Sequence, residues 1–199
     1  MTESVVIEGV EFAAALTLRS GVGLLALHGS KEGGTAELAH EVAARTGTSC
    51  LVFTQPAGDP VHIPSHRMAV PHCESLQEFL AAVTVVVSLH GHLRPDFPRT
   101  IFLGGGNRTA AGTLADSLAL LTPPFDTVTD MTAIPSGLRG LHPRNPVNLA
   151  PAKGVQVELP LSARTQHPGK VQGAPDLPPR PVTEALTAGV GRLTAERPG

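Results

Sequence analysis

Short runs of β-branched and aliphatic residues alternate along the chain with segments of helical composition. The apolar runs predict five strands, at residues 21–27, 50–53, 83–89, 100–103 and 154–159. The other periodic segments predict helices over 37–45 with Thr35 as N-cap, after a capping pair at Ser75 and Glu78, and around Leu114, Leu118 and Leu121. This alternation is typical of a mostly parallel sheet covered by helices on both faces. We therefore expect an α/β fold.

Proline, glycine and polar residues accumulate after the last predicted strand. Residues 165–181 cannot bury much apolar surface, so this stretch is predicted to be a linker. Beyond it, Leu186, Val190 and Leu193 recur at helical spacing. We expect a folded domain over 1–164, the linker, and a helix with a tail over 182–199. That helix either docks on the domain or mediates association.

Composition narrows the range of functions. Aromatic residues make up 3% of the 199 residues, with no Trp and no Tyr, so a surface that stacks nucleobases is excluded. The formal net charge of −2 gives no overall attraction to nucleic acid or anionic membranes. No apolar stretch is long enough for a membrane span, and the N-terminus lacks a signal-peptide pattern. We expect a cytoplasmic protein, with Cys50 and Cys73 as free thiols.

A histidine and a glutamate flank a glycine-containing turn after the first predicted strand. His28 stands at the end of that strand, and Glu32 follows four residues later. Imidazole and carboxylate are both suitable zinc ligands, and glycines allow the turn that would bring them together. The alternative is an ordinary strand-to-helix turn with a solvated glutamate.

The third predicted strand also ends in a histidine followed by glycine. His90 therefore lies at the carboxyl end of a strand, where sites gather in open α/β sheets. With His28 and Glu32 it would form a ligand set that leaves a coordination position for water, as a catalytic zinc requires. An ordinary strand-end histidine is the alternative for His90, and an exposed loop position is the preferred interpretation of His92.

The last predicted strand carries a candidate general base. Val155, Val157 and Leu159 alternate with Gln156 and Glu158, which places Glu158 on the less apolar face. A carboxylate on a central strand needs a partner, and a water activated by a metal is one such partner. If the strand lies at the edge of the sheet, Glu158 simply faces solvent.

Other polar residues are candidates for binding substrate. They are Asn107 in a glycine-rich turn that could cradle an anion, His66, and three arginines near the last strand, Arg139, Arg144 and Arg164. Surface positions are the alternative for each. A phosphate-binding P-loop and a Gly-x-Ser-x-Gly elbow are both missing from the sequence, which argues against nucleoside triphosphate binding and a serine hydrolase.

Three segments, 28–37, 88–91 and 154–159, resemble the motifs of a known family in their residues and in their order along the chain. The family is that of the phage poly-γ-glutamate hydrolases and their bacterial relatives, which are described as phage-related replication proteins. The resemblance covers about residues 24–164. It implies a three-layer α/β/α fold like that of zinc carboxypeptidases, with zinc (Zn²⁺) held by His28, Glu32 and His90. The family's proposed catalytic glutamate falls on Glu158.

The chain departs from the family motifs at two places that affect the predicted site and substrate. The turn after His28 is one residue shorter than the usual form, so Glu37 is an alternative carboxylate ligand. The segment after His66 lacks the family's common Phe-Asp-Glu-Pro motif, which weakens the inference that this chain has the family's substrate.

Together these features predict a zinc-dependent hydrolase of amide bonds. Its substrate would be peptide-like, with the γ-glutamyl bonds of poly-γ-glutamate as the default, and its carboxylates would meet the arginines. The alternatives are a hydrolase of another peptide, acyl-amino acid or cell-wall amide, a non-catalytic metal- or ligand-binding domain, and a purely structural domain.

Overall fold

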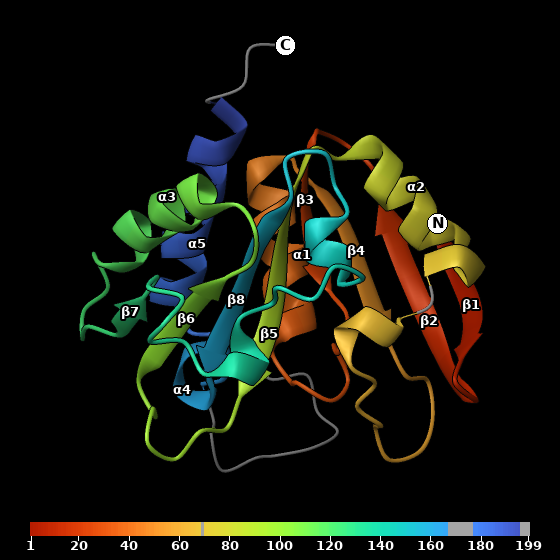
Figure 1. Ribbon diagram of the computed structural model, residues 1–199, viewed down its shortest axis with the longest axis horizontal. Helices are drawn as coiled ribbons and strands as arrows, with labels where there is room; N and C mark the ends of the chain where they lie inside the picture. Colours follow the sequence, from red (N-terminus) through yellow and green to blue (C-terminus); the bar gives the residue numbers. More distant parts are fainter. Residues whose placement is uncertain (69, 167–176, 196–199) are drawn as a thin grey trace.

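The computed structural model describes residues 1–68, 70–166 and 177–195. Within these ranges eight strands form one mixed sheet in the order β1-β2-β4-β3-β5-β8-β6-β7 (Figure 1). The strands are β1 (Thr2–Ile7), β2 (Val10–Thr17), β3 (Val22–Ala26), β4 (Ser49–Thr54), β5 (Val85–His92), β6 (Thr100–Gly104), β7 (Asp126–Val128) and β8 (Gly154–Pro160). The central strands β4, β3, β5 and β8 are parallel, whereas β2 joins β4 and β6 joins β8 in antiparallel pairs. The predicted α/β class with a mixed sheet is confirmed.

Helices cover both faces of the sheet. The helical segments are α1 (Thr35–Thr46), α2 (Glu74–Ala82), α3 (Arg108–Leu118), α4 (Leu161–Arg164), α5 (Arg180–Ala195) and the short 3₁₀ turns η1 (Ser65–Arg67), η2 (Val70–His72), η3 (Ser136–Leu138) and η4 (Pro146–Asn148). Apolar residues of α1, α3 and α5 pack into one buried cluster against the sheet. A second cluster, which contains Leu76 and Phe79 of α2, lies against the other face. The arrangement is the expected three-layer α/β/α sandwich.

The C-terminal helix α5 belongs to the main core. Leu186 and Val190 are buried and share a cluster with residues of α1 and α3. Of the two alternatives for this helix, docking on the domain is the one observed. The predicted linker 165–181 lies mostly outside the described residues. None of the described helices is long and apolar enough to cross a membrane.

The N-terminal hairpin of β1 and β2 was not predicted. Its two-residue turn, Glu8-Gly9, has positive φ angles at both positions, which suits a turn matched to strand twist. Phe12, Ala14 and Leu16 alternate on the buried face of β2. The alanine-rich composition of β2 hides this alternation, because alanine has little preference for strands.

The N-terminus of α2 is capped differently from the prediction. Cys73 occupies the N-cap position but its side chain makes no capping hydrogen bond to the helix, and the Ser75–Glu78 pair does not form the capping contact. Instead, the carboxylate of Glu3 in β1 accepts hydrogen bonds from the backbone N–H groups of Glu74 (3.1 Å) and Ser75 (2.7 Å). A tertiary contact therefore replaces the local one. The two cysteines are free, as expected.

Strands β5 and β8 divide their side chains between the core and the site. In β8, Val155, Val157 and Leu159 point into the cluster beneath α1, α3 and α5. Gln156 and Glu158 therefore project from the opposite face, as the alternation predicted. β8 is flanked by β5 and β6, so it is a central strand, and Glu158 is buried.

Candidate active site and metal centre

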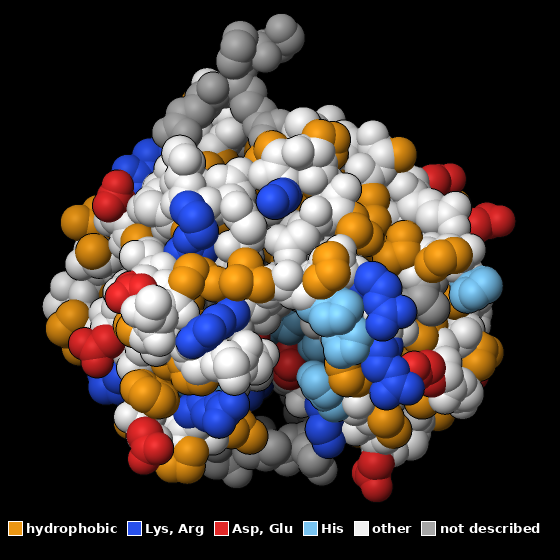
Figure 2. Space-filling model, in the orientation of Figure 1, with side chains coloured by type: hydrophobic (Ala, Val, Ile, Leu, Met, Phe, Trp, Pro, Cys, Tyr) orange, Lys and Arg blue, Asp and Glu red, His pale blue; other side chains and the backbone are white. Residues whose placement is uncertain are grey.

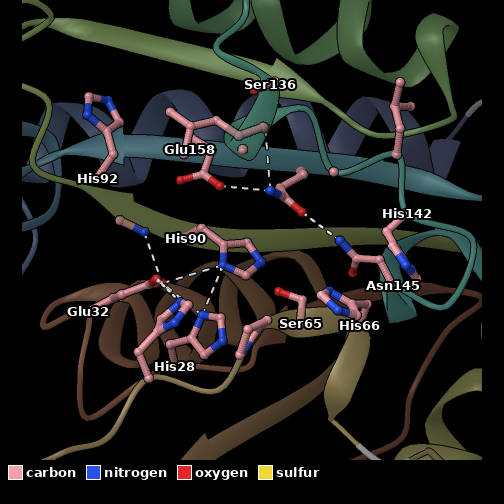
Figure 3. A pocket seen from close by; sticks show the side chains of 18 of the residues that line it. His28, Glu32, Ser65, His66, His90, His92, Ser136, His142, Asn145 and Glu158 are labelled. Atoms are coloured by element: carbon pink, nitrogen blue, oxygen red, sulfur yellow. Dashed lines mark hydrogen bonds and ion pairs between the residues drawn. The ribbon is translucent and has the colours of Figure 1, made fainter.

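Three neighbouring strands supply the central side chains of the site. His28 follows β3 by two residues, His90 lies in β5 and Glu158 in β8 (Figure 3). The strand order places β3, β5 and β8 side by side, and His90 is the register partner of Glu158. The carboxyl ends of parallel strands meet at one edge of a sheet, so residues 62 positions apart in sequence converge there.

A cavity of about 500 Å³ opens at this edge. Its lining includes His28, Glu32, His90 and Glu158 from the strand ends, together with residues of the loops that precede η1 and η4. Figure 2 shows histidine side chains gathered along one side of a hollow in this face, with an acidic side chain visible inside it. The cavity is large enough for a few residues of a peptide-like substrate.

His28, Glu32 and His90 form a buried group of potential metal ligands. One donor atom from each lies within 4.8 Å of the other two. Nδ1 of His28 is 3.1 Å from Oε1 of Glu32, and Nδ1 of His90 is 3.5 Å from Oε2. The two Nδ1 atoms are 3.2 Å apart. Among the described residues this is the only such group of three or more, and Glu32 rather than Glu37 provides its carboxylate.

The outer nitrogens of both imidazoles already have partners. Nε2 of His28 donates to the carbonyl oxygen of Ile63 at 2.8 Å, and Nε2 of His90 lies 2.9 Å from Oγ of Ser88. A carbonyl only accepts, so Nε2 of His28 is the donor in this contact, and Nδ1 is the ring atom that faces His90 and Glu32. Metal-ligating histidines are held in this way by hydrogen bonds from their other nitrogen. The donor set therefore fits a divalent metal ion.

The turn between His28 and α1 aims Glu32 at the histidines. The backbone N–H of Glu32 donates to the carbonyl of His28 at 2.7 Å. Gly34 adopts a φ of 87°, and a Cβ there would collide with the carbonyl oxygen of Arg164. The N–H of Gly91 then donates to Oε2 of Glu32 at 3.0 Å. Glycine is required at position 34 for both its φ and its close contact.

Burial and partners set the acid strength of Glu32 and His90. Burial opposes ionisation of Glu32, but hydrogen bonds from His28 and His90 outweigh it and hold the pKa of Glu32 well below its ordinary range. Burial also lowers the pKa of His90, yet the contact with Glu32 reverses this effect and leaves that pKa raised. The carboxylate is therefore ionised, as a metal ligand must be.

Glu158 lies in the same pocket with a different environment. Burial raises its pKa to about 7, although the positive field of His90 and a hydrogen bond from Gln156 act in the opposite direction. A carboxyl group with a pKa near neutrality is suited to accept a proton and release it again.

The structure places most of the residues predicted to bind substrate outside the pocket lining. Asn107 caps α3 by accepting from the N–H of Ala110, and Arg139 donates to the carbonyl of Ile134. Arg144 is exposed away from the lining. His66 does line the pocket, where its ring stacks on His142 with centroids 4.1 Å apart.

Arg164 lies behind the metal-ligand group rather than in the cavity. Its Nη1 donates to the carbonyl of Gly33 at 2.6 Å, and a Cβ at Gly91 would come within 2.5 Å of its Nε. The side chain is buried, which lowers the pKa of Arg164 against the opposing effects of Glu32 and Glu158. This position corrects the expectation of a substrate contact, because the guanidinium packs beneath Gly91 and holds the turn that carries Glu32.

Several lining residues were missed from the sequence as members of the site. They are Arg94, His142, Asn145 and Gln156. The signal for Gln156 was present, because it shares the polar face of its strand with Glu158. Arg94 and His142 lie in loops whose sequence carries no periodicity, so only the tertiary fold reveals them. His92, expected to be exposed, is buried, and its Nε2 donates to the carbonyl of Thr100 at 2.8 Å.

Comparison with solved structures gives two close likenesses in fold. A bacteriophage poly-gamma-glutamate hydrolase matches with 21% identity and a TM-score of 0.73, over 95% of this chain and 92% of that one. A zinc-free structure of a protein called YNDL matches with 23% identity and a TM-score of 0.71, over 93% and 90% of the two chains. A metallo-carboxypeptidase from Burkholderia cenocepacia is more distant, with 10% identity and a TM-score of 0.48 over 96% and 64%.

Comparison with curated protein sequences finds no match. The model of the poly-gamma-glutamate hydrolase family matches residues 7–171, which is most of the chain. This match confirms the resemblance carried by the three sequence segments, and with it the prediction of an enzyme that hydrolyses amide bonds. The chain belongs to the poly-gamma-glutamate hydrolase family.

Proposed function

We propose that this chain hydrolyses γ-glutamyl amide bonds of poly-γ-glutamate, with a zinc ion held by His28, Glu32 and His90. The observation that carries the proposal is the meeting of three oriented ligand atoms and a separate buried carboxyl group in one cavity. A set of two histidines and a glutamate is one that zinc adopts in hydrolases. When bound, zinc supplies Lewis-acid activation of water and of the scissile carbonyl.

Glu158 acts as the general base and then as the general acid. It accepts a proton from the attacking water as the new C–O bond forms, and it returns that proton to the leaving nitrogen as the C–N bond breaks. The products are a carboxylic acid and an amine, which at neutral pH become a carboxylate and an ammonium group by transfer of the acid proton. The pKa of about 7 lets the same group accept and donate near neutral pH.

Substrate carboxylates meet the rim of the cavity. Arg94 is exposed there, and His66 and His142 provide ring nitrogens on the opposite loops. The N–H of Arg144 donates to Nδ1 of His142, which leaves Nε2 of the neutral ring as an N–H donor. We assign the binding of γ-glutamyl carboxylates to these groups, in place of the arginines expected from the sequence.

A second candidate substrate class is favoured by the charge of the lining. Among the described residues that line the cavity, Arg94 is the sole arginine or lysine, while Glu32 and Glu158 are acidic. A substrate with one carboxylate, such as a short peptide or an acyl-amino acid, would suit this balance better than a polyanion.

The direct test is incubation of the zinc-loaded protein with poly-γ-glutamate, followed by measurement of newly formed amino groups. Poly-α-glutamate and an acyl-amino acid panel serve as comparison substrates. Release from the γ-linked polymer, lost in Glu158→Gln, is the expected result. Cleavage of only the comparison substrates would support the second class, and no cleavage at all would leave a metal-binding domain.

A further inference from the structure

Three amide and carboxyl side chains form a hydrogen-bonded chain along one wall of the cavity (Figure 3). Nδ2 of Asn145 donates to Oε1 of Gln156 at 2.9 Å, and Nε2 of Gln156 donates to Oε1 of Glu158 at 2.7 Å. All three side chains are buried and line the cavity. The chain thus connects the loop before η4 to the candidate general base on β8.

Two backbone groups, one beside Asn145 and one beside Gln156, fix the direction of this chain. The N–H of Val147 lies 3.3 Å from Asn145 and only donates, so the atom facing it is Oδ1, and Nδ2 faces Gln156. The carbonyl of Leu138 lies 3.4 Å from Gln156 and only accepts, so the atom facing it is Nε2. Both contacts require the same orientation of the amides. Gln156 therefore offers Glu158 a donor and never an acceptor.

The amide of Gln156 is also held sterically. Gly140 packs against it, and a Cβ at that position would come within 2.6 Å of Oε1 of Gln156. Gly140 adopts a φ of 65°, which glycine tolerates and larger residues disfavour. The side chain of Gln156 is consequently fixed by three contacts, from Asn145, Leu138 and Gly140.

A fixed donor at Oε1 separates the two oxygens of Glu158. Oε1 is occupied by the N–H of Gln156, and none of the hydrogen bonds among the described residues uses Oε2. A proton taken up by the carboxyl group is therefore favoured on Oε2, since Oε1 already accepts a hydrogen bond from Gln156.

We propose that Gln156, held by Asn145, is a positioning residue that makes Oε2 of Glu158 the atom that accepts and returns the proton. The inference deepens the proposed function and rests on it. Oε2 takes one proton from water as the C–O bond forms, and gives it to the nitrogen as the C–N bond breaks. Loss of the chain lets the carboxyl group rotate, so that the basic oxygen is no longer held in place.

The kinetic test uses Gln156→Met, which keeps the side-chain length but removes the hydrogen bonds with Asn145, Glu158 and Leu138, and Asn145→Ala, which removes the support of Gln156. We expect kcat to fall about tenfold or more in each, because a small displacement of a catalytic group from its productive position lowers the rate by this much. KM and the zinc dissociation constant should change less than about twofold, since neither residue belongs to the ligand group. An unchanged kcat in Gln156→Met would overturn the proposal.

Asn148→Ala is the matched control. Asn148 lies in the same 3₁₀ turn region. Among the described residues its side chain bonds only to backbone atoms, accepting from Gly106 and donating to Gly140 and His142. The variant loosens this loop without removing a member of the chain. It should lose thermal stability, and its kcat should fall less than that of Asn145→Ala, because Gly140 loses an anchor while the hydrogen bonds of the chain remain. A fall in kcat equal to that of Asn145→Ala would show a general loop effect and overturn the proposal.

A spectroscopic arm separates failure of this inference from failure of the proposed function. The side-chain amide signal of Gln156, assigned by its disappearance in Gln156→Met, should shift in both Asn145→Ala and Glu158→Ala, with zinc bound in all samples. This readout does not need turnover. If the wild type does not cleave poly-γ-glutamate, the proposed function is contradicted. The amide signal still tests whether the hydrogen bonds among Asn145, Gln156 and Glu158 form. A signal that stays unmoved in both variants would overturn the inference.

Discussion

The two buried carboxyl groups of the cavity, Glu32 and Glu158, differ in what surrounds them. Glu32 faces two imidazole rings and the N–H of Gly91, and these partners keep its pKa low despite burial. Glu158 has one amide donor, from Gln156, and burial raises its pKa to about 7. Residue type and burial alone therefore do not determine the role. The partners keep Glu32 ionised near neutral pH, whereas Glu158 has a pKa at which a carboxyl group can accept and release a proton.

Among the substitutions that test this difference between Glu32 and Glu158, the largest expected effect is the loss of turnover in Glu158→Gln. The amide cannot accept the proton of water, so kcat should fall about 100-fold to 10,000-fold. KM should change little, because Glu158 contributes to proton transfer rather than to holding the substrate. Steady-state kinetics on poly-γ-glutamate with equal zinc loading measures this. Turnover equal to wild type would remove Glu158 from the mechanism.

The metal-free protein should reveal the two carboxyl groups through opposite pH dependences of stability. The pKa of Glu158 is raised from 4.5 to about 7, so its contribution to stability is present below about pH 4.5 and is lost as pH rises through 7. Glu158→Gln should therefore gain stability over wild type from pH 5 to 8, by up to about 3 kcal/mol.

Glu32 has the reverse sign, because its folded-state pKa is lowered. Its contribution is present above about pH 4.5 and is lost as pH falls further. Wild type should therefore lose its stability advantage over Glu32→Gln in acid. Urea unfolding with a chelator, from pH 3 to 8, measures both variants. Parallel pH profiles for the two would contradict the contrast.

Arg164 offers a smaller test of what holds Glu32 in place. Arg164→Met removes the hydrogen bond to Gly33 and the buried cation beside both carboxyl groups. Zinc affinity should fall about tenfold, as is common when a partner behind a metal ligand is lost. KM should remain unchanged. Arg139→Met is the matched control, with zinc affinity as in wild type. A raised KM with normal zinc affinity in Arg164→Met would restore the role predicted from the sequence.

The smallest effects are expected at Arg144 and Asn107. Arg144 is exposed and Asn107 caps α3, and both lie outside the cavity lining. KM should change less than about twofold in Arg144→Ala and Asn107→Ala, with some loss of stability in the latter from the missing cap. A fivefold rise in KM in either variant would show that substrate extends beyond the cavity.

The positions of the candidate metal ligands and of the candidate base were predictable because regular strands carry them. A buried strand that ends in His-Gly predicts that its histidine lies at the carboxyl edge of the sheet. The alternation of apolar and polar residues in β8 predicts the face from which Glu158 projects. These residues need only the sheet, whose central strands were all predicted. The turn that aims Glu32 was also readable from its glycines, although the choice over Glu37 required the structure.

The substrate-contact predictions had less physical basis. The predicted arginines lie close to the site in sequence. The direction of a long arginine side chain, however, depends on the structure of loops, whose sequences have no periodic pattern. Arg164 folds beneath Gly91, while Arg94 reaches the rim from a loop that sequence analysis left unassigned. The Glu3 contact that caps α2 was likewise invisible, because it joins residues more than 70 positions apart. Long-range contacts of loops and caps follow only from the complete fold.

The most direct test of the account is zinc content by mass spectrometry on untagged wild type beside His28→Ala, His90→Ala and Glu158→Gln. The account predicts about one zinc per chain in wild type and in Glu158→Gln, and loss of the metal in both histidine variants. Absence of metal from wild type after zinc is supplied and the excess removed would contradict it. Zinc retained in both histidine variants would contradict it equally.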